Sequence, residues 1–175
     1  MSVEEVLSQF KKGIAETVPE DDAATHYDLG CAYRDMGLLD DALSEFAIAA
    51  RAPSRAADAR YLIGVTLADQ GRSAEAIAAL TDALASPGTT RDQRAACQYQ
   101  LGVCHEDGSA LSEALAAFKQ AKALGHAAVD LDRRISTLIG KVGDPEPGGG
   151  SNGSNGHGHS KAPVVPQKAK NIDYL

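Results

Sequence analysis

The 175-residue sequence predicts an all-α solenoid of stacked helix pairs, and three observations lead to that prediction. Alanine is abundant, only 5% of residues are aromatic and Trp is absent, which favours closely packed helices over a β-sandwich. Apolar residues recur with helical spacing over residues 1–141. A pattern with a period of roughly 34 residues also appears three times, and periods of that length are typical of stacked helical repeats.

The chain is expected to open with an amphipathic helix. Pro19 ends this helix, and Pro53 and Pro87 are further breakers that lie one repeat length apart. The spacing of the two later prolines is a sign of internal repetition. The apolar face of the first helix carries Val3, Val6, Leu7, Phe10 and Ile14.

Each repeat is defined by a glycine that follows Leu or Ile in the first helix of a pair. An alanine of the second helix follows at a constant distance, and a bulky side chain stands one helical turn after that alanine. The two small residues let the helices approach closely, and the bulky one fills the remaining space. These structural positions are Gly30, Ala42 and Phe46; Gly64, Ala76 and Leu80; and Gly102, Ala114 and Phe118.

The turns inside the pairs are expected at Gly37, Gly71 and Gly108, because glycine tolerates a helix end with φ > 0. The third repeat is offset, since Gly102 follows Gly64 at a longer distance than Gly64 follows Gly30. A few extra residues, near 91–94, therefore extend either a loop or the next helix.

These residues and spacings resemble the tetratricopeptide repeat (TPR) family over residues 23–90 and 95–128. The resemblance implies a right-handed solenoid of three helix pairs, with the N-terminal helix before them and residues 129–141 as a polar capping helix. The sequence departs from the family at His26, Arg60 and Gln98, where a bulky aromatic residue is usual. Residues 10–46 also look like TPR modules of large bacterial proteins, some tied to polar motility machinery.

Two parts of the chain are expected: a TPR-like domain over residues 1–141 and a disordered linker with a short tail over residues 142–175. The linker is rich in Gly, Ser and Asn, a composition typical of flexible segments. The last residues, NIDYL, are a candidate short motif. The tail is neutral by side chains, so the net charge of −7 belongs to the helical part.

The resemblance implies that the first helix of each pair lines a concave, peptide-binding groove. Tyrosine suits binding surfaces, although the same side chains would also stabilise neighbouring pairs, and exposed aspartates would also suit a solvated rim. The predicted groove carries Tyr27, Tyr61 and Tyr99; Cys31, Val65 and Val103; and Asp35, Asp69 and Asp107, with Glu106 on the same edge and Arg34 as the one base there. The clamp of Lys, Arg and Asn that grips chaperone C-termini is absent, which disfavours a co-chaperone.

We therefore expect a non-catalytic, cytoplasmic adaptor or scaffold that binds a protein or peptide segment with basic and apolar residues. A bacterial motility or polarity complex is a candidate setting. The alternative is a structural subunit that self-associates through its N-terminal helix or by docking its tail; the oligomeric state is left open. The negative charge opposes nucleic-acid binding, the chain has no apolar run long enough to enter a membrane, and its N-terminus lacks the features of a secretory signal.

No cofactor, metal site or catalytic constellation is expected. Cys31 with His26, or Cys104 with His105, are conceivable thiol and base pairs, but all four lie at repeat positions with packing roles. The three cysteines are expected to be reduced. A His-Gly-His sequence in the tail lacks the further ligands that a zinc site needs.

Overall fold

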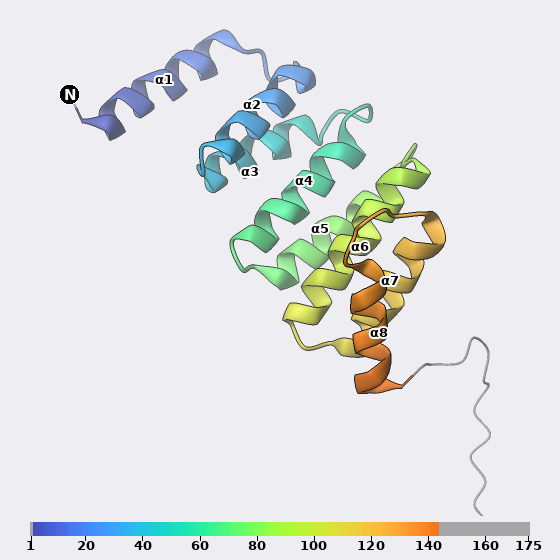
Figure 1. Ribbon diagram of the computed structural model, residues 1–175. Coiled ribbons are helices and arrows are strands. Elements are labelled where there is room, and N and C mark those ends of the chain that lie inside the picture. Colours follow the sequence, from blue (N-terminus) through green and yellow to red (C-terminus); the bar gives the residue numbers. More distant parts are fainter. Residues whose placement is uncertain (1, 144–175) are drawn as a thin grey trace, which may run out of the picture. The chain divides into compact units, whose positions relative to one another are not determined.

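The computed structural model describes residues 2–143, except for the side chains of residues 3, 4 and 15, and this part is entirely helical without strands (Figure 1). The predicted disordered linker and tail lie outside the described residues from 144 onward. The helices are α1 (Val3–Thr17), α2 (Ala23–Asp35), α3 (Leu39–Ala49), α4 (Ala56–Asp69), α5 (Ser73–Ala85), α6 (Arg91–Asp107), α7 (Leu111–Leu124) and α8 (Leu131–Val142).

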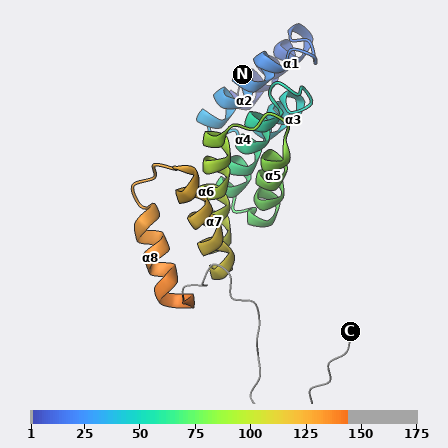
Figure 2. The same ribbon diagram turned by 90° about the vertical axis from the view of Figure 1, so that its right-hand side faces the viewer.

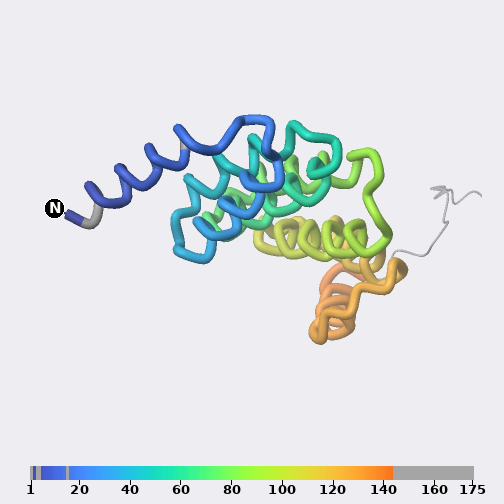
Figure 3. The backbone as a smooth tube through the Cα atoms, turned by 90° about the horizontal axis from the view of Figure 1, so that it is seen from above, coloured from blue at the N-terminus to red at the C-terminus, as the bar shows by residue number. Residues whose placement is uncertain are grey.

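The predicted arrangement of three helix pairs with a helix at each end is confirmed. The pairs are α2–α3, α4–α5 and α6–α7, and each contacts the next, so that they form a TPR-like solenoid (Figures 1 and 2). The view from above shows α1 leading away from the first pair (Figure 3). At the other end α8 packs on α7 and ends at Val142.

The glycines of the repeat lie where the two helices of a pair come closest. A Cβ atom added to Gly64 would be 2.6 Å from Cγ of Leu80 and 3.3 Å from the Ala76 carbonyl oxygen. Alanine at this position of the first helix would therefore already be too large. The same contact recurs in the other pairs, where a Cβ would meet the ring of Phe46 or Phe118 at 2.5 Å; the glycines there are Gly30 and Gly102.

The buried core forms three clusters along the stack. Its central cluster combines Leu80 of α5 with Cys97 and Leu101 of α6, and the bulky residues of the second helices are fully buried. The alanines at the repeat positions, Ala42, Ala76 and Ala114, are fully buried as well. Burial of apolar surface between neighbours holds the stack together.

The third turn corrects one prediction. Gly37 and Gly71 adopt the expected positive φ of 77° and 74°. Gly108 has a φ of −79°, and the positive φ of 60° falls on Ser109 instead. Ser109 follows Gly71 at the same distance at which Gly102 follows Gly64, so the turn keeps its place in the repeat and Gly108 stands one residue before it.

The extra residues of the third repeat lengthen a helix and not a loop. Thr90 caps α6 in a reciprocal capping box with Gln93, so the helix begins at Arg91. The Arg91 guanidinium donates hydrogen bonds to the carbonyl oxygens of Leu124 at 3.0 Å and Ala123 at 3.3 Å. The added turn thus satisfies carbonyl groups at the end of α7 that have no partner within that helix.

Polar bonds replace the aromatic residue that the family usually has near the start of the first helix. His26 is buried, with Nδ1 2.6 Å from the Glu45 carboxylate of α3 and Nε2 3.1 Å from the Pro19 carbonyl oxygen. At the equivalent position Arg60 donates a hydrogen bond of 2.6 Å to the Ser86 hydroxyl. The contact of His26 with Glu45 links the first helix of its pair to the second helix. The bond from Arg60 links its helix to Ser86, the residue that follows the second helix of that pair.

Candidate peptide-binding surface

The first helices of the three pairs present equivalent residues on one face, because the repeats are in register. The predicted tyrosine row and apolar row are half-buried, whereas the predicted aspartate row is exposed. The half-buried residues are Tyr27, Tyr61, Tyr99, Cys31, Val65 and Val103, and the exposed ones are Asp35, Asp69 and Asp107.

Tyr27 lies at the junction between the first and second pairs. Its ring centroid is 5.9 Å from that of Phe46, and the Arg55 guanidinium lies 5.0 Å from the Tyr27 centroid. Tyr61 packs against the central cluster that includes α6. Burial raises the pKa of both phenols, which keeps them neutral hydrogen-bond donors. Each ring thus contributes to stacking and leaves part of its surface open.

Tyr99 is held more tightly, by the connection that follows α7. Its ring lies 4.6 Å from the His126 imidazole, and its hydroxyl donates a hydrogen bond of 2.8 Å to Asp130. Val103, on the same face of α6, packs against the cluster that includes α8 residues. The third repeat therefore shares this face with the C-terminal helix.

The aspartates end the first helices. Asp35, Asp69 and Asp107 are the last residues of α2, α4 and α6. A carboxylate there faces the negative end of the helix dipole, which costs about 0.3–1 kcal/mol at an exposed site. Only Asp69 is compensated, since Arg34 of the preceding pair donates a hydrogen bond of 2.9 Å to it. Within residues 2–143, Asp35 and Asp107 form no ion pair with a basic side chain.

Arg34, the one predicted base of the groove, is half-buried and already partly engaged. Its Nη2 bonds Asp69, but its Nε is buried and has no acceptor among the described residues. An unpaired buried donor costs free energy.

Glu106 belongs to a different contact from the one expected. Arg134 of α8 forms an ion pair with Glu106 and a second one, at 2.5 Å, with Asp130. The hydrogen bonds with Asp130 and Glu106 raise the pKa of Arg134, and those from Arg134 and Tyr99 lower the pKa of Asp130. Glu106 thus attaches α8 to α6. Sequence reasoning missed Arg134 and Asp130, although a spacing of one helical turn at the start of a helix is typical of an ion pair.

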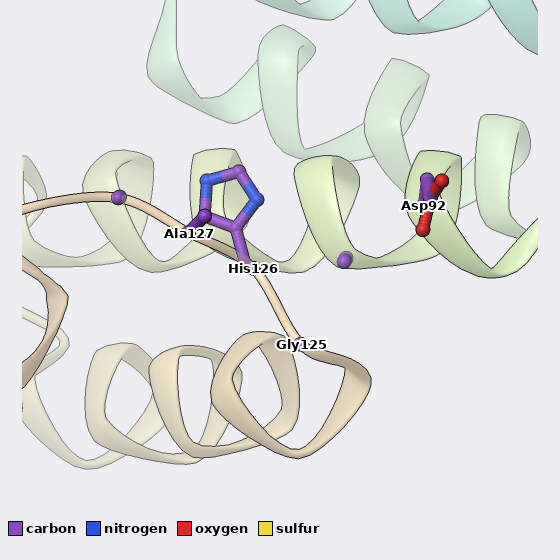
Figure 4. A pocket seen from close by; sticks show the side chains of 6 residues that line it. Asp92, Gly125, His126 and Ala127 are labelled. Carbon is purple, nitrogen blue, oxygen red and sulfur yellow. The ribbon is translucent and has the colours of Figure 1, made fainter.

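A shallow cavity of about 460 Å³ lies beside the connection between α7 and α8, and no residue of the predicted rows lines it. Figure 4 shows the His126 imidazole lying over α6, with Asp92 further along the same helix. The remaining lining consists of small residues, namely Ala95, Gly125, Ala127 and Ala128. Two separated titratable side chains do not form a catalytic arrangement.

The cysteines lack the surroundings of reactive thiols. Burial raises the pKa of Cys97 to about 11 and also raises the pKa of Cys104, which opposes thiolate formation. The nitrogens of His26 contact Glu45 and Pro19 and not Cys31. Among residues 2–143, no cluster of His, Cys, Asp or Glu is suited to hold a metal ion, and none of the helices there could cross a bilayer.

The fold and the repeated inner-face residues define a helical repeat protein. The family model described as Tetratricopeptide repeat matches residues 27–89 and 69–129. These ranges cover more than half of the chain, and the chain belongs to the tetratricopeptide repeat family. Among curated proteins, no sequence matches it.

Solved structures of TPR proteins share the fold. The crystal structure of MamA is 22% identical with a TM-score of 0.63, and the match covers 77% of this chain and 75% of that one. The first TPR of Spaghetti (RPAP3), bound to the HSP90 peptide SRMEEVD, is 13% identical with a TM-score of 0.62 and coverages of 73% and 98%. The Sgt2 TPR domain from Aspergillus fumigatus is 12% identical with a TM-score of 0.60 and coverages of 78% and 93%. At these identities the likeness concerns the fold alone.

Proposed function

We propose that this protein is a non-catalytic adaptor that binds a peptide or protein segment along the inner face of α2, α4 and α6. The observation that carries the proposal is the aspartate at the end of each first helix. Each opposes the local helix dipole, and two of the three have no compensating base among the described residues. Residues that weaken a local element without an evident structural gain are expected at functional sites.

The partner chemistry follows from the side chains beside those aspartates. Asp35 and Asp107 offer exposed carboxylates, and Tyr27 and Tyr61 offer half-buried rings. A segment that interleaves Lys or Arg with apolar residues fits both, because the carboxylates attract the cations and the rings bury the apolar side chains.

The comparison with the RPAP3 domain bears on the charge of the proposed peptide. That domain is bound to an HSP90 peptide ending in Glu-Glu-Val-Asp, whereas the face of this chain carries aspartates and its one predicted base, Arg34, is already paired with Asp69. An acidic peptide is therefore the disfavoured ligand here.

The setting we propose is cytoplasmic, in keeping with three free cysteines. A bacterial assembly for motility or cell polarity is the proposed context, and it rests on the resemblance of residues 10–46 to TPR modules of large bacterial proteins.

The test is selection of a displayed random peptide library on the immobilised full chain. We expect the recovered peptides to be enriched in Lys or Arg together with apolar residues. The double variant Asp35→Lys, Asp107→Lys should bind these peptides about 2- to 30-fold more weakly, given about 0.2–1 kcal/mol for each exposed charge. The control variant Asp82→Lys, Glu113→Lys changes the net charge equally on exposed positions of α5 and α7 and should bind normally.

Stability separates this result from misfolding. Lysine at the two helix ends complements the dipole, so the groove variant should be more stable than the parent by about 0.3–1 kcal/mol at each site. Recovered peptides without basic residues, or equal affinity of the parent and the groove variant, would contradict the proposal.

A further inference from the structure

The helices at the two ends of the described stack each resemble one half of a further repeat. The segment Val6-Leu7-Ser8-Gln9-Phe10 of α1 matches the segment Ala42-Leu43-Ser44-Glu45-Phe46 of α3 position by position. Gly13 then takes the place of the buried Ala49. By this register α1 corresponds to the second helix of a pair.

The C-terminal helix corresponds to a first helix. Ile139-Gly140 continues the series Leu29-Gly30, Ile63-Gly64 and Leu101-Gly102, and Gly140 follows Gly102 at the same distance at which Gly102 follows Gly64. α8 also packs on α7 as α6 packs on α5. The sequence after α8 lacks the signature of a second helix, because Asn152 and Gly156 stand at the positions of its small and bulky residues.

The faces that would meet the missing helices are open in the described structure. Val6 and Phe10 are 52% and 53% exposed, whereas Ala42 and Phe46, their equivalents, are fully buried. A Cβ added at Gly140 would have nothing within 4 Å. At the three equivalent glycines it would meet the bulky residue of the second helix at 2.5–2.6 Å.

α1 contacts the first pair at its other end. Lys11 forms an ion pair of 2.5 Å with Asp41, and Ile14 packs against the cluster of Tyr33, Ala42 and Phe46. The contacts therefore lie in the C-terminal half of α1, and Val6 and Phe10 stay uncovered.

The two open faces are complementary. In register with the existing pairs, the Phe10 ring would cover Gly140 as Phe46 covers Gly30. Gln9 would lie opposite Ser136. These two residues are equivalent to Glu45 and His26, which contact each other within the first pair. The antiparallel arrangement also brings Lys141, in the last turn of α8, close to the N-terminal end of α1, where Glu5 lies. Opposite charges at adjacent helix ends favour this orientation over its reverse.

We propose that copies of this chain associate head to tail, with α8 of one copy and α1 of the next completing a fourth helix pair. The contact is heterologous, so it continues from copy to copy unless the assembly closes into a ring. Self-association would leave the inner face of α2, α4 and α6 free for the proposed peptide.

The test is sedimentation velocity of the full chain over a series of concentrations. The parent should form species larger than a dimer as concentration rises. Phe10→Gln and Gly140→Leu should each weaken self-association by about tenfold or more, because each removes one side of the contact. Matched controls are Met36→Gln, which changes an apolar residue of 56% exposure, and Ala116→Leu, which adds bulk to an exposed position of α7. Both controls should assemble like the parent.

Mixing the two defective variants gives the decisive result. The Phe10→Gln chain keeps a functional α8 and the Gly140→Leu chain keeps a functional α1, so the mixture should form heterodimers and nothing larger. A monomeric parent would overturn the proposal. Loss of assembly in Phe10→Gln but not in Gly140→Leu would overturn it as well, in favour of pairing between two α1 helices or docking of the tail on α1. Unchanged circular dichroism of both variants excludes misfolding.

Discussion

Replacing glycine by alanine should have opposite effects on stability at Gly64 and at Gly140. Alanine is the better helix former by about 0.8–1 kcal/mol. At Gly140 the new methyl group meets nothing within 4 Å, so the variant should gain about that amount. This comparison uses dilute protein, at which the proposed head-to-tail contact does not form.

At Gly64 the methyl group has no room. Its carbon would lie 2.6 Å from Cγ and 2.8 Å from Cδ2 of Leu80, and 3.3 Å from the Ala76 carbonyl oxygen. Leu80 is fully buried and cannot rotate into solvent, so the two helices must separate. Overpacking of this kind costs about 1–3 kcal/mol, more than the gain of about 0.8–1 kcal/mol in helix propensity, so Gly64→Ala should be destabilised. Gly64→Leu adds still more bulk and should be worse.

Urea denaturation followed by circular dichroism measures both variants, and thermal melting checks them. For a domain of this size 1 kcal/mol corresponds to about 2–4 °C, so the two alanine variants should differ in melting temperature by several degrees. If Gly64→Ala and Gly140→Ala shift stability equally, or if Gly64→Leu melts like the parent, the proposed register of the helix pairs is wrong.

Two further predictions concern single residues. The pKa of Cys97 is about 11 in the folded protein and about 8.5 in an unfolded chain. The folded state therefore holds the thiol proton more tightly. The stability that the protonated thiol contributes is complete below the unfolded pKa and is lost as pH rises toward 11. The free energy of unfolding of the parent should thus fall by roughly 2–3 kcal/mol more over this range than that of Cys97→Ala; parallel pH profiles would contradict it. Ser109 has a φ of 60°, a conformation that costs a non-glycine residue about 1–2 kcal/mol, so Ser109→Gly should raise and Gly71→Ser should lower the melting temperature; a destabilised Ser109→Gly would show that the serine side chain itself is needed.

The pairing of helices was predictable because small and large residues alternate at fixed distances. Gly30, Gly64 and Gly102 each meet the bulky residue of the second helix, and this contact depends only on residues within one pair. The order of the helices then follows, since each pair leaves one face that only a neighbour can cover.

The details that could not be predicted depend on contacts between pairs or on the inserted residues. The longer spacing before the third repeat left open whether a loop or a helix is extended. The hydrogen bonds from Arg91 to the end of α7 show why the extra residues extend the helix. The pairing of Glu106 with Arg134 joins residues that are distant in sequence and lie on different elements. The aspartate row could be placed on one face from its spacing, but the compensation of Asp69 by Arg34 requires knowledge of how two pairs stack.

The confinement of contacts to neighbouring helices also determines how the chain reaches its native state. The extensive contacts between helices join elements that are adjacent in sequence, apart from those between α4 and α6. The contact order is therefore low, and little loop entropy is lost before native contacts form. Proteins of this kind fold in microseconds to milliseconds. Folding can begin in any pair and spread in both directions, and unfolding proceeds from the two ends, where α1 and α8 have a neighbour on one side only.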